Sequence, residues 1–196
     1  MLSALPGIMM AYHGTLQADV KRVVDGRGGQ HLTCSTKDYD WLGPADYFWE
    51  NSEVRAESWA QENHAGQDAA VRAVLLLGSC LDLLDQQYID VVERAAVDMC
   101  AEHERVGMPI PVNTGAGAYR FDRALIDYIL AAPEDKEFGK FDSARAAHIE
   151  GEPILGRSPF YRQSHIQIAI YNLNRFKGYF WPQQEAMVAP YFSPVS

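Results

Sequence analysis

The stretch Ala11-Tyr12-His13-Gly14-Thr15 (AYHGT) comes directly after the apolar run Ile8-Met9-Met10 near the start of the sequence. Residues Ile8 to His13 have the composition of a buried strand, so the polar end of AYHGT falls where that strand opens into a turn. A histidine, a glycine and a threonine there supply a ring nitrogen, a backbone open to close approach and a hydroxyl. Taken alone, such a strand end is more often structural. With partners elsewhere in the chain, it predicts a site that holds a polar ligand.

The composition is typical of one soluble globular domain, which we expect to span residues 1–196. Of the 196 residues, 47% are hydrophobic and 22% are charged, and the formal net charge is -9. This charge opposes non-specific binding to nucleic-acid phosphates or anionic membranes, while a local basic groove remains compatible with it. The longest apolar stretch, 70–77, is too short to cross a bilayer, and the first ten residues lack the cationic start of a secretory signal. We therefore expect a cytoplasmic protein without membrane contact. Three cysteines without metal-ligand spacing predict no metal site.

Four segments have the apolar spacing and the end signals of helices. They are Gln17–Asp25, a segment capped by Asn51 or Ser52 that ends near His64, Gln86–Arg105 and Phe121–Ala132. In the second of these helices, Val54, Trp59 and Ala60 are the expected core contacts. The last two helices form a helical insertion of about residues 86–135.

Strand patterns occur over Ala69–Gly78 and over HIQIAIYN (165–172), whose alternating side chains suit a strand with one buried face. After a turn at Leu173-Asn174, FKGYFW (176–181) is expected to pair with HIQIAIYN as a hairpin. DYFWEN (46–51), considered alone, is typical of an edge strand that packs aromatic side chains into the core. The sequence therefore predicts an α+β fold, with helices packed on short, mostly antiparallel strands.

Three separate segments share features that scaffolding alone does not need: YHGT (12–15), GPADYFWENSEVRAESWA (43–60) and SHIQIAIYN (164–172). Together, in this order, they resemble the ADP-ribosyltransferase family, in its diphtheria-toxin and PARP-like branch. In that branch a first strand ends in His-Gly-Thr or His-Gly-Ser, a second reads Gly-x-Gly-x-Tyr-Phe, and a later strand presents a glutamate. Here Ala45 replaces the second glycine of the Tyr-Phe pattern, and Gln167 stands at the position of the glutamate. The resemblance implies an ADP-ribosyltransferase-like core and a chain that uses NAD+ as co-substrate.

Carried over residue by residue, the resemblance implies that His13 hydrogen-bonds a ribose hydroxyl of NAD+. It also implies that Gly14 offers its backbone to the nicotinamide carboxamide and that Tyr47 stacks on the nicotinamide ring. Each role suits its residue, because glycine permits close approach and a phenol ring stacks with little entropy to lose.

Three further residues complete the NAD+-binding set that the resemblance implies. They are Thr15, Arg55 and Trp59. Arg55 matches a position where PARPs usually carry a serine, so the contact made there differs from the family's.

The third motif departs most from the family, because a glutamine keeps the hydrogen bond of the glutamate and loses its charge. The resemblance gives the glutamate the task of stabilising the oxocarbenium-like charge that grows as nicotinamide leaves. His165, two residues before Gln167, faces the same side of a strand and is the candidate general base. Glu150 or Glu152 in the neighbouring loop is the alternative source of a carboxylate.

The segment Gly156–Gln163 occupies the position of the family's acceptor-recognition loop. Its two arginines and two aromatics could stack a base and meet phosphates, or could contact a protein. These candidate acceptor-binding residues are Arg157, Phe160, Tyr161 and Arg162.

The expected activity is that of a single-domain transferase that splits NAD+ and moves ADP-ribose to a macromolecule, either nucleic acid or protein. By analogy, compact bacterial proteins of this kind are often toxins of toxin-antitoxin or phage-defence systems, with an antitoxin protein as partner. Two alternatives stay open. One is an NAD+ glycohydrolase, and the other is a catalytically silent module that binds NAD+ or ADP-ribose.

Overall fold

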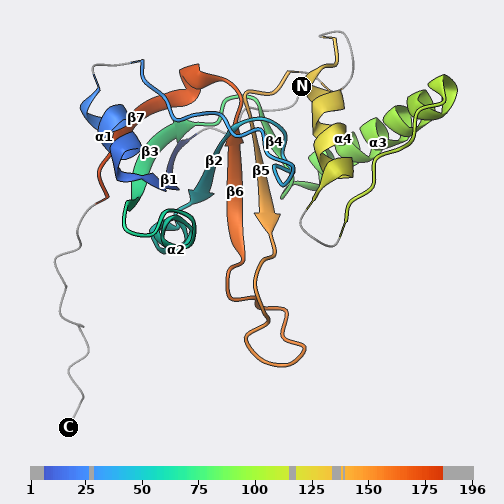
Figure 1. Cartoon of the computed structure of the whole chain (residues 1–196). Coiled ribbons are helices and arrows are strands. Elements are labelled where there is room, and N and C mark those ends of the chain that lie inside the picture. The colour runs from blue at the N-terminus through green and yellow to red at the C-terminus, as the bar shows by residue number, and fades with distance from the viewer. Residues whose placement is uncertain (1–6, 27–28, 115–117, 134–137, 139, 183–196) are drawn as a thin grey trace.

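A seven-stranded sheet forms the centre of the molecule, in the order β4-β5-β6-β2-β1-β3-β7 (Figure 1). The computed structural model describes residues 7–26, 29–114, 118–133, 138 and 140–182. Every pairing in the sheet is antiparallel except that of β4 with β5. The strands are β1 (Ile8–Leu16), β2 (Asp46–Glu50), β3 (Asp68–Leu76), β4 (Cys80–Asp82), β5 (Ser143–His148), β6 (His165–Ile170) and β7 (Phe176–Phe180).

The described residues form four α-helices, and they divide between the two faces of the sheet. The helices are α1 (Gln17–Asp25), α2 (Glu53–His64), α3 (Gln86–Val106) and α4 (Arg120–Leu130), with a short 3-10 turn at Leu173–Arg175. On one face, Val20 and Val23 of α1 share a core with Phe48. On the other face, α2 covers β1 and β3, whereas α3 and α4 cover the β4–β5–β6 half. The helices on this second face therefore leave the middle strands, β2 and β6, between two helical blocks.

The mixed α and β character and the mostly antiparallel strands confirm the sequence prediction at that level. All four predicted helices are present, with ends within two residues of the expected ones. The described part of the predicted insertion consists of α3 and α4. Residues 115–117 and 134–135 of the insertion lie outside the described residues.

Four predictions about the strands and their packing are wrong. DYFWEN is not an edge strand, because β2 lies between β6 and β1. The first strand does not open into a turn after His13, since β1 runs on to Leu16 in register with β3. The expected hairpin between HIQIAIYN and FKGYFW does not form, because β6 is paired on both edges by β2 and β5 and β7 pairs with β3 instead. Val54 is 77% exposed, whereas Arg55 and Ala56 are the buried residues at the start of α2. β4 and β5 had no sequence prediction, since three residues and an alanine-rich run carry little strand signal.

Gly14 sets how closely α2 approaches the sheet. A Cβ atom at Gly14 would lie 2.2 Å from the carbonyl oxygen of Ala56 and 3.1 Å from the backbone nitrogen of Ala60. Both helix residues are fully buried alanines. The absence of a side chain at position 14 therefore lets the α2 backbone pack against β1.

Over the described ranges, no helix has the length and apolarity needed to cross a membrane.

Replacement of Gly14 by alanine is expected to reduce the free energy of unfolding by about 1–3 kcal/mol, because helix or strand must move to admit the methyl group. Urea unfolding measures the change. Gly178→Ala is the matched control, since its Cβ would meet only the Phe180 ring, a side chain that can turn. Equal stabilities of Gly14→Ala and Gly178→Ala would show that α2 does not depend on this contact.

Candidate functional site

β1 and β2 separate after only two pairs of residues, and a side chain bridges the gap. The ladder joins Ala11 to Glu50 and Tyr12 to Trp49 and then stops. Nδ1 of His13 lies 2.7 Å from the carbonyl oxygen of Tyr47, beyond the end of that ladder. Since a carbonyl only accepts, Nδ1 must carry a proton, and in the neutral ring Nε2 is then an acceptor. The split between the two strands therefore presents one imidazole acceptor.

Burial lowers the pKa of His13, and the hydrogen bond to the Tyr47 carbonyl opposes this only in part. A lowered pKa favours the neutral imidazole at pH 7. The ring is held further by a tilted contact with Phe48, with centroids 5.6 Å apart. His13 thus combines a fixed orientation with a single, predictable tautomer.

A cavity of about 330 Å³ opens where β1 and β2 diverge. It lies between the end of β1, the loop segment 33–40, β2, α2 and β6. Of the residues predicted for the site, this cavity brings six together: His13, Gly14, Thr15, Tyr47, Trp59 and Gln167. Thr15 also points its hydroxyl to Asp19, at 3.4 Å. The sequence therefore identified the three strand segments that meet in one cavity, although His13, Gly14, Thr15 and Gln167 lie inside their strands and not at the ends.

Tyr47 is fixed by its hydroxyl as well as by its buried ring. The hydroxyl donates to the Gly43 carbonyl at 2.7 Å and accepts from the Leu42 N–H at 3.1 Å. Burial raises the pKa of this hydroxyl far above its usual range, so it stays protonated. Tyr47 therefore contributes a rigid ring surface to the cavity rather than an ionisable group.

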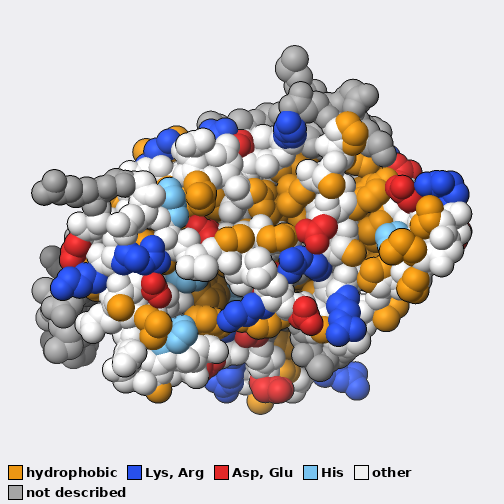
Figure 2. Space-filling model, turned by 45° about the horizontal axis from the view of Figure 1, so that its top comes forward, with side chains coloured by type: hydrophobic (Ala, Val, Ile, Leu, Met, Phe, Trp, Pro, Cys, Tyr) orange, Lys and Arg blue, Asp and Glu red, His pale blue; other side chains and the backbone are white. Residues whose placement is uncertain are grey.

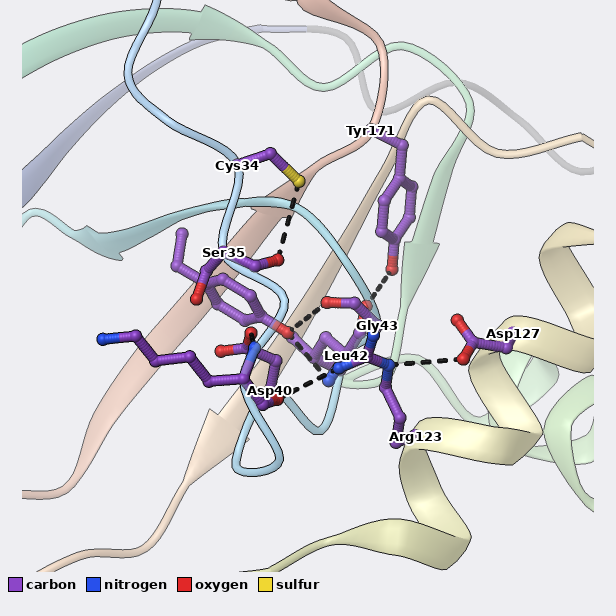
Figure 3. A network of polar contacts seen from close by, with 10 residues as sticks. Cys34, Ser35, Asp40, Leu42, Gly43, Arg123, Asp127 and Tyr171 are labelled. Atoms are coloured by element: carbon purple, nitrogen blue, oxygen red, sulfur yellow. Dashed lines mark hydrogen bonds and ion pairs between the residues drawn. The ribbon is translucent and has the colours of Figure 1, made fainter.

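The loop that lines the cavity is held in place by Tyr171 and by α4 of the helical insertion (Figure 3). The Leu42 carbonyl accepts from Tyr171 at 2.7 Å. Arg123 on α4 donates to the Lys37 carbonyl at 3.0 Å and pairs with Asp127 at 3.2 Å. The insertion, which carries no part of the family resemblance, thus holds the loop that lines the cavity.

Gln167 has a defined amide orientation. Its Oε1 accepts from the indole N–H of Trp41 at 2.5 Å. An indole nitrogen can only donate, so the amide oxygen must face Trp41, and the amide NH₂ is the group left for other partners. A ligand in the cavity would therefore meet a hydrogen-bond donor at this position, and no negative charge.

A second bay of about 490 Å³ adjoins the first and shares Tyr39, Trp49, Trp59 and Gln167 with it. It contains the two remaining residues predicted to act close to the ligand, Arg55 and His165. The shared residues join the two bays into one cleft along β2 and β6, and β1 contributes to the first bay only.

Arg55 and His165 meet at the loop residue Glu150. Arg55 donates from Nη2 to Glu150 at 2.8 Å, and His165 Nδ1 lies 3.7 Å from the same carboxylate oxygen. Nδ1 also lies 2.8 Å from the Gln163 carbonyl, which makes it the protonated nitrogen. Burial lowers the pKa of His165 and of its neighbour His148, so both rings favour the neutral form. The bay therefore contains one ion pair and two neutral imidazoles.

The acceptor loop candidates lie apart from both bays. Phe160 is 69% exposed, and Arg157, Tyr161 and Arg162 are exposed as well. None of the four lines either bay, whereas Ile149, Glu150 and Gly151 at the base of the same loop do. The loop is ordered as a turn by main-chain hydrogen bonds, among them Ile154 to Phe160 and Arg162 to Glu152. The structure thus places these four side chains outside the cleft.

Several lining residues were absent from the sequence prediction. Trp49 could have been found, because it lies two residues after Tyr47 on one strand and so shares its face. His148 pairs directly with His165 across β5 and β6, but this register depends on a strand that the sequence did not reveal. Trp41 belongs to a loop, where sequence spacing gives no position.

Within the described ranges, no group of three or more histidine, cysteine, aspartate or glutamate side chains is placed to hold a metal ion. Comparison of the chain with models of protein families, with curated proteins and with solved structures gave no match.

His13 is expected to titrate below the ordinary histidine pKa of about 6.5, as followed by the ring C–H resonances in NMR spectra. The unfolded chain then binds a proton that the folded chain refuses, so His13 contributes stability that is lost as the pH falls below about 6.5. His13→Gln identifies the resonance and removes that part of the pH dependence. A His13 pKa at or above 6.5 would contradict the buried, neutral ring.

Proposed function

We propose that the protein is an ADP-ribosyltransferase that cleaves NAD+ in this cleft. One observation supports the proposal above the others. Three residues that the family resemblance selected from segments more than 30 positions apart, His13, Tyr47 and Gln167, line one cavity on three neighbouring strands. A purely structural origin of the three motifs gives no reason for them to share a cavity.

The residues of the first bay suit the parts of NAD+ that the resemblance assigns to them. The Nε2 acceptor of His13 suits a ribose hydroxyl, and the ring of Tyr47 suits stacking by nicotinamide. Gly14 lines the same cavity, with the α2 backbone packed close against it. The binding of NAD+ would therefore rely on preorganised neutral groups, whose orientation is fixed before the ligand arrives.

In the proposed reaction the bond between nicotinamide nitrogen and the ribose C1 breaks. Nicotinamide leaves with the bonding electrons, which neutralise its ring charge, while positive charge grows on the ribose. The acceptor oxygen or nitrogen then bonds to C1 and gives up its proton to a base. His165, whose Nε2 is an unprotonated acceptor in the second bay, is the side chain suited to take that proton.

Gln167 sets the limit on the rate in this scheme. A glutamate would place negative charge beside the growing positive charge, whereas an amide turned by Trp41 offers only N–H donors. The carboxylate of the second bay, Glu150, is already paired with Arg55. This arrangement favours slow cleavage, and it gives weight to the second candidate, a module that binds NAD+ or ADP-ribose without turnover.

The cellular location and the partner protein are part of the same proposal. We propose that the protein is cytoplasmic and acts as a toxin whose activity an antitoxin protein holds in check. The antitoxin would cover the cleft, because that is where both bays open.

The direct test is incubation of the purified protein with NAD+ labelled in its adenylate part, together with separate pools of protein, RNA and DNA. Nicotinamide release and label in one pool are expected for the transferase. Release without label would identify a glycohydrolase. Stabilisation by NAD+ without release would identify the binding module.

Gln167→Glu is expected to raise the rate of nicotinamide release by about 10²–10³, the usual effect of one preorganised electrostatic group. The new carboxylate keeps one oxygen for the Trp41 N–H and presents the other to the ligand. Gln167→Leu, which removes both functions, is the control and should not exceed the natural protein.

His13→Ala should lower nicotinamide release at least tenfold, because it removes a ligand contact and leaves the Tyr47 carbonyl without its partner. Unchanged release in His13→Ala together with no gain in Gln167→Glu would rule out this cleft as the site of NAD+ cleavage.

A further inference from the structure

The second bay contains polar atoms that are buried and have no partner among the described residues. They are Nε and Nη1 of Arg55, Nε1 of Trp49 and Nε2 of His165. Each of the three side chains is more than nine-tenths buried, with exposed fractions of 8%, 7% and 4%. Leaving such groups unsatisfied costs about 1–3 kcal/mol each and more for a charge. A cluster of this kind at a cavity wall indicates a ligand that satisfies it.

The three side chains form one connected group. The Arg55 guanidinium lies over the Trp49 ring at 5.5 Å from its centroid, and the Trp49 and His165 rings are 5.9 Å apart in an edge-on contact. Glu150 bonds Arg55 on the side of Nη2. All four residues line the second bay, so a single bound group could reach them together.

The unpartnered atoms define what that group must offer. Arg55 and Trp49 can only donate hydrogen bonds, so they call for an anionic or strongly accepting oxygen. Nε2 of His165 is an acceptor, because Nδ1 holds the ring proton against the Gln163 carbonyl. The complementary ligand therefore combines an oxyanion with a neighbouring hydroxyl that donates. A ribose hydroxyl next to a phosphate has this combination, and a carboxylate side chain has only the first half of it.

We propose that the second bay is the acceptor site of the enzyme and that it binds RNA, with a backbone phosphate on Arg55 and Trp49 and a ribose hydroxyl on His165. This inference rests on the proposed function for the meaning of the word acceptor, but the binding itself needs no NAD+. His165 would then receive the proton of the hydroxyl that attacks ribose C1 of NAD+ in the adjoining bay.

The loop that leaves the bay at Glu150 favours nucleic acid over an acidic protein, through side chains that lie outside the bay. The loop that begins at Glu150 carries Arg157 and Arg162 together with the exposed rings of Phe160 and Tyr161, a combination that suits phosphates and stacked bases. On the one face drawn in Figure 2, basic and acidic side chains are interspersed, without a single large basic patch. Recognition would therefore be local, through the bay and its loop, and would not depend on a general positive field.

Glu150 acts as a built-in competitor for the phosphate. Its carboxylate already takes one N–H of Arg55, and its side chain is 36% exposed, so it can be displaced outward. A phosphate that binds Arg55 must overcome repulsion by this carboxylate. Removal of the charge at position 150 should strengthen RNA binding, whereas removal of the charge at position 55 should weaken it.

The test measures binding without NAD+. The purified protein is titrated with a hexaadenylate ribonucleotide, with the matching deoxyribonucleotide and with hexaglutamate, and the tryptophan indole N–H resonances report where each binds. Trp49→Phe assigns the relevant resonance. The ribonucleotide is expected to shift the Trp49 signal and to bind at least fivefold more tightly than the deoxyribonucleotide, which lacks the 2′ hydroxyl.

Two variants of opposite sign sharpen the test. Arg55→Met should weaken ribonucleotide binding at least tenfold, and Glu150→Gln should strengthen it about threefold or more. Arg105→Met is the matched control, because Arg105 is a 70% exposed arginine on α3, and it should leave the affinity within twofold. If Arg55→Met does not fold, Glu150→Gln alone decides, since the side chain at position 150 is 36% exposed and a glutamine amide oxygen can still accept from Arg55.

Unchanged or weaker binding by Glu150→Gln, equal affinity for the two nucleotides, or no ribonucleotide binding would overturn the proposal. Tighter binding of hexaglutamate at Trp49 would also overturn it, in favour of a protein acceptor. Failure of the proposed function has a different signature: RNA binding that follows these variants, in a protein that releases no nicotinamide.

Discussion

The cleft depends on the hydrogen bond that His13 donates to the Tyr47 carbonyl. A sheet normally continues its ladder until a strand ends, and here β1 and β2 part after two pairs while both strands run on. The imidazole satisfies the carbonyl that the ladder abandons. Without such a bridge, an unpaired buried carbonyl would favour closing the gap. The same side chain therefore keeps the sheet open and supplies a polar group to the opening.

The sequence was informative where a local pattern carries the information. AYHGT, DYFWEN and HIQIAIYN correctly marked the strands that line the cavity, and the helices followed from their apolar spacing. The β6–β7 hairpin was wrong because a short turn between two apolar runs says nothing about which distant strands compete for the same edges. Long-range pairing, such as that of β3 with β7, leaves no local trace.

The candidate site divides in the same way, into residues that local motifs reveal and partners that only the fold brings near. His13, Tyr47 and Gln167 could be chosen from motifs, but the meaning of Gln167 depends on Trp41, which lies 126 positions away. Arg55 was chosen for its position after the aromatic motif, and its burial beneath Glu150 could not be inferred from a helix of mostly polar residues. Residues on recognisable strands are predictable, whereas the partners that set their chemistry, Trp41 and Glu150, come from loops.

The order of the strands also governs when the cleft can exist during synthesis. β2 pairs with β6, so Trp49 meets Gln167 only after 118 more residues have been made. At about 5–20 residues per second, that interval lasts roughly 6–24 s. During this time β1 and β3 can already pair around α2, because all three lie within the first 76 residues. A ribosome-bound chain therefore exposes the side of the cleft formed by β1 and α2. The side formed by β6 is added only when the sheet is almost completely synthesised.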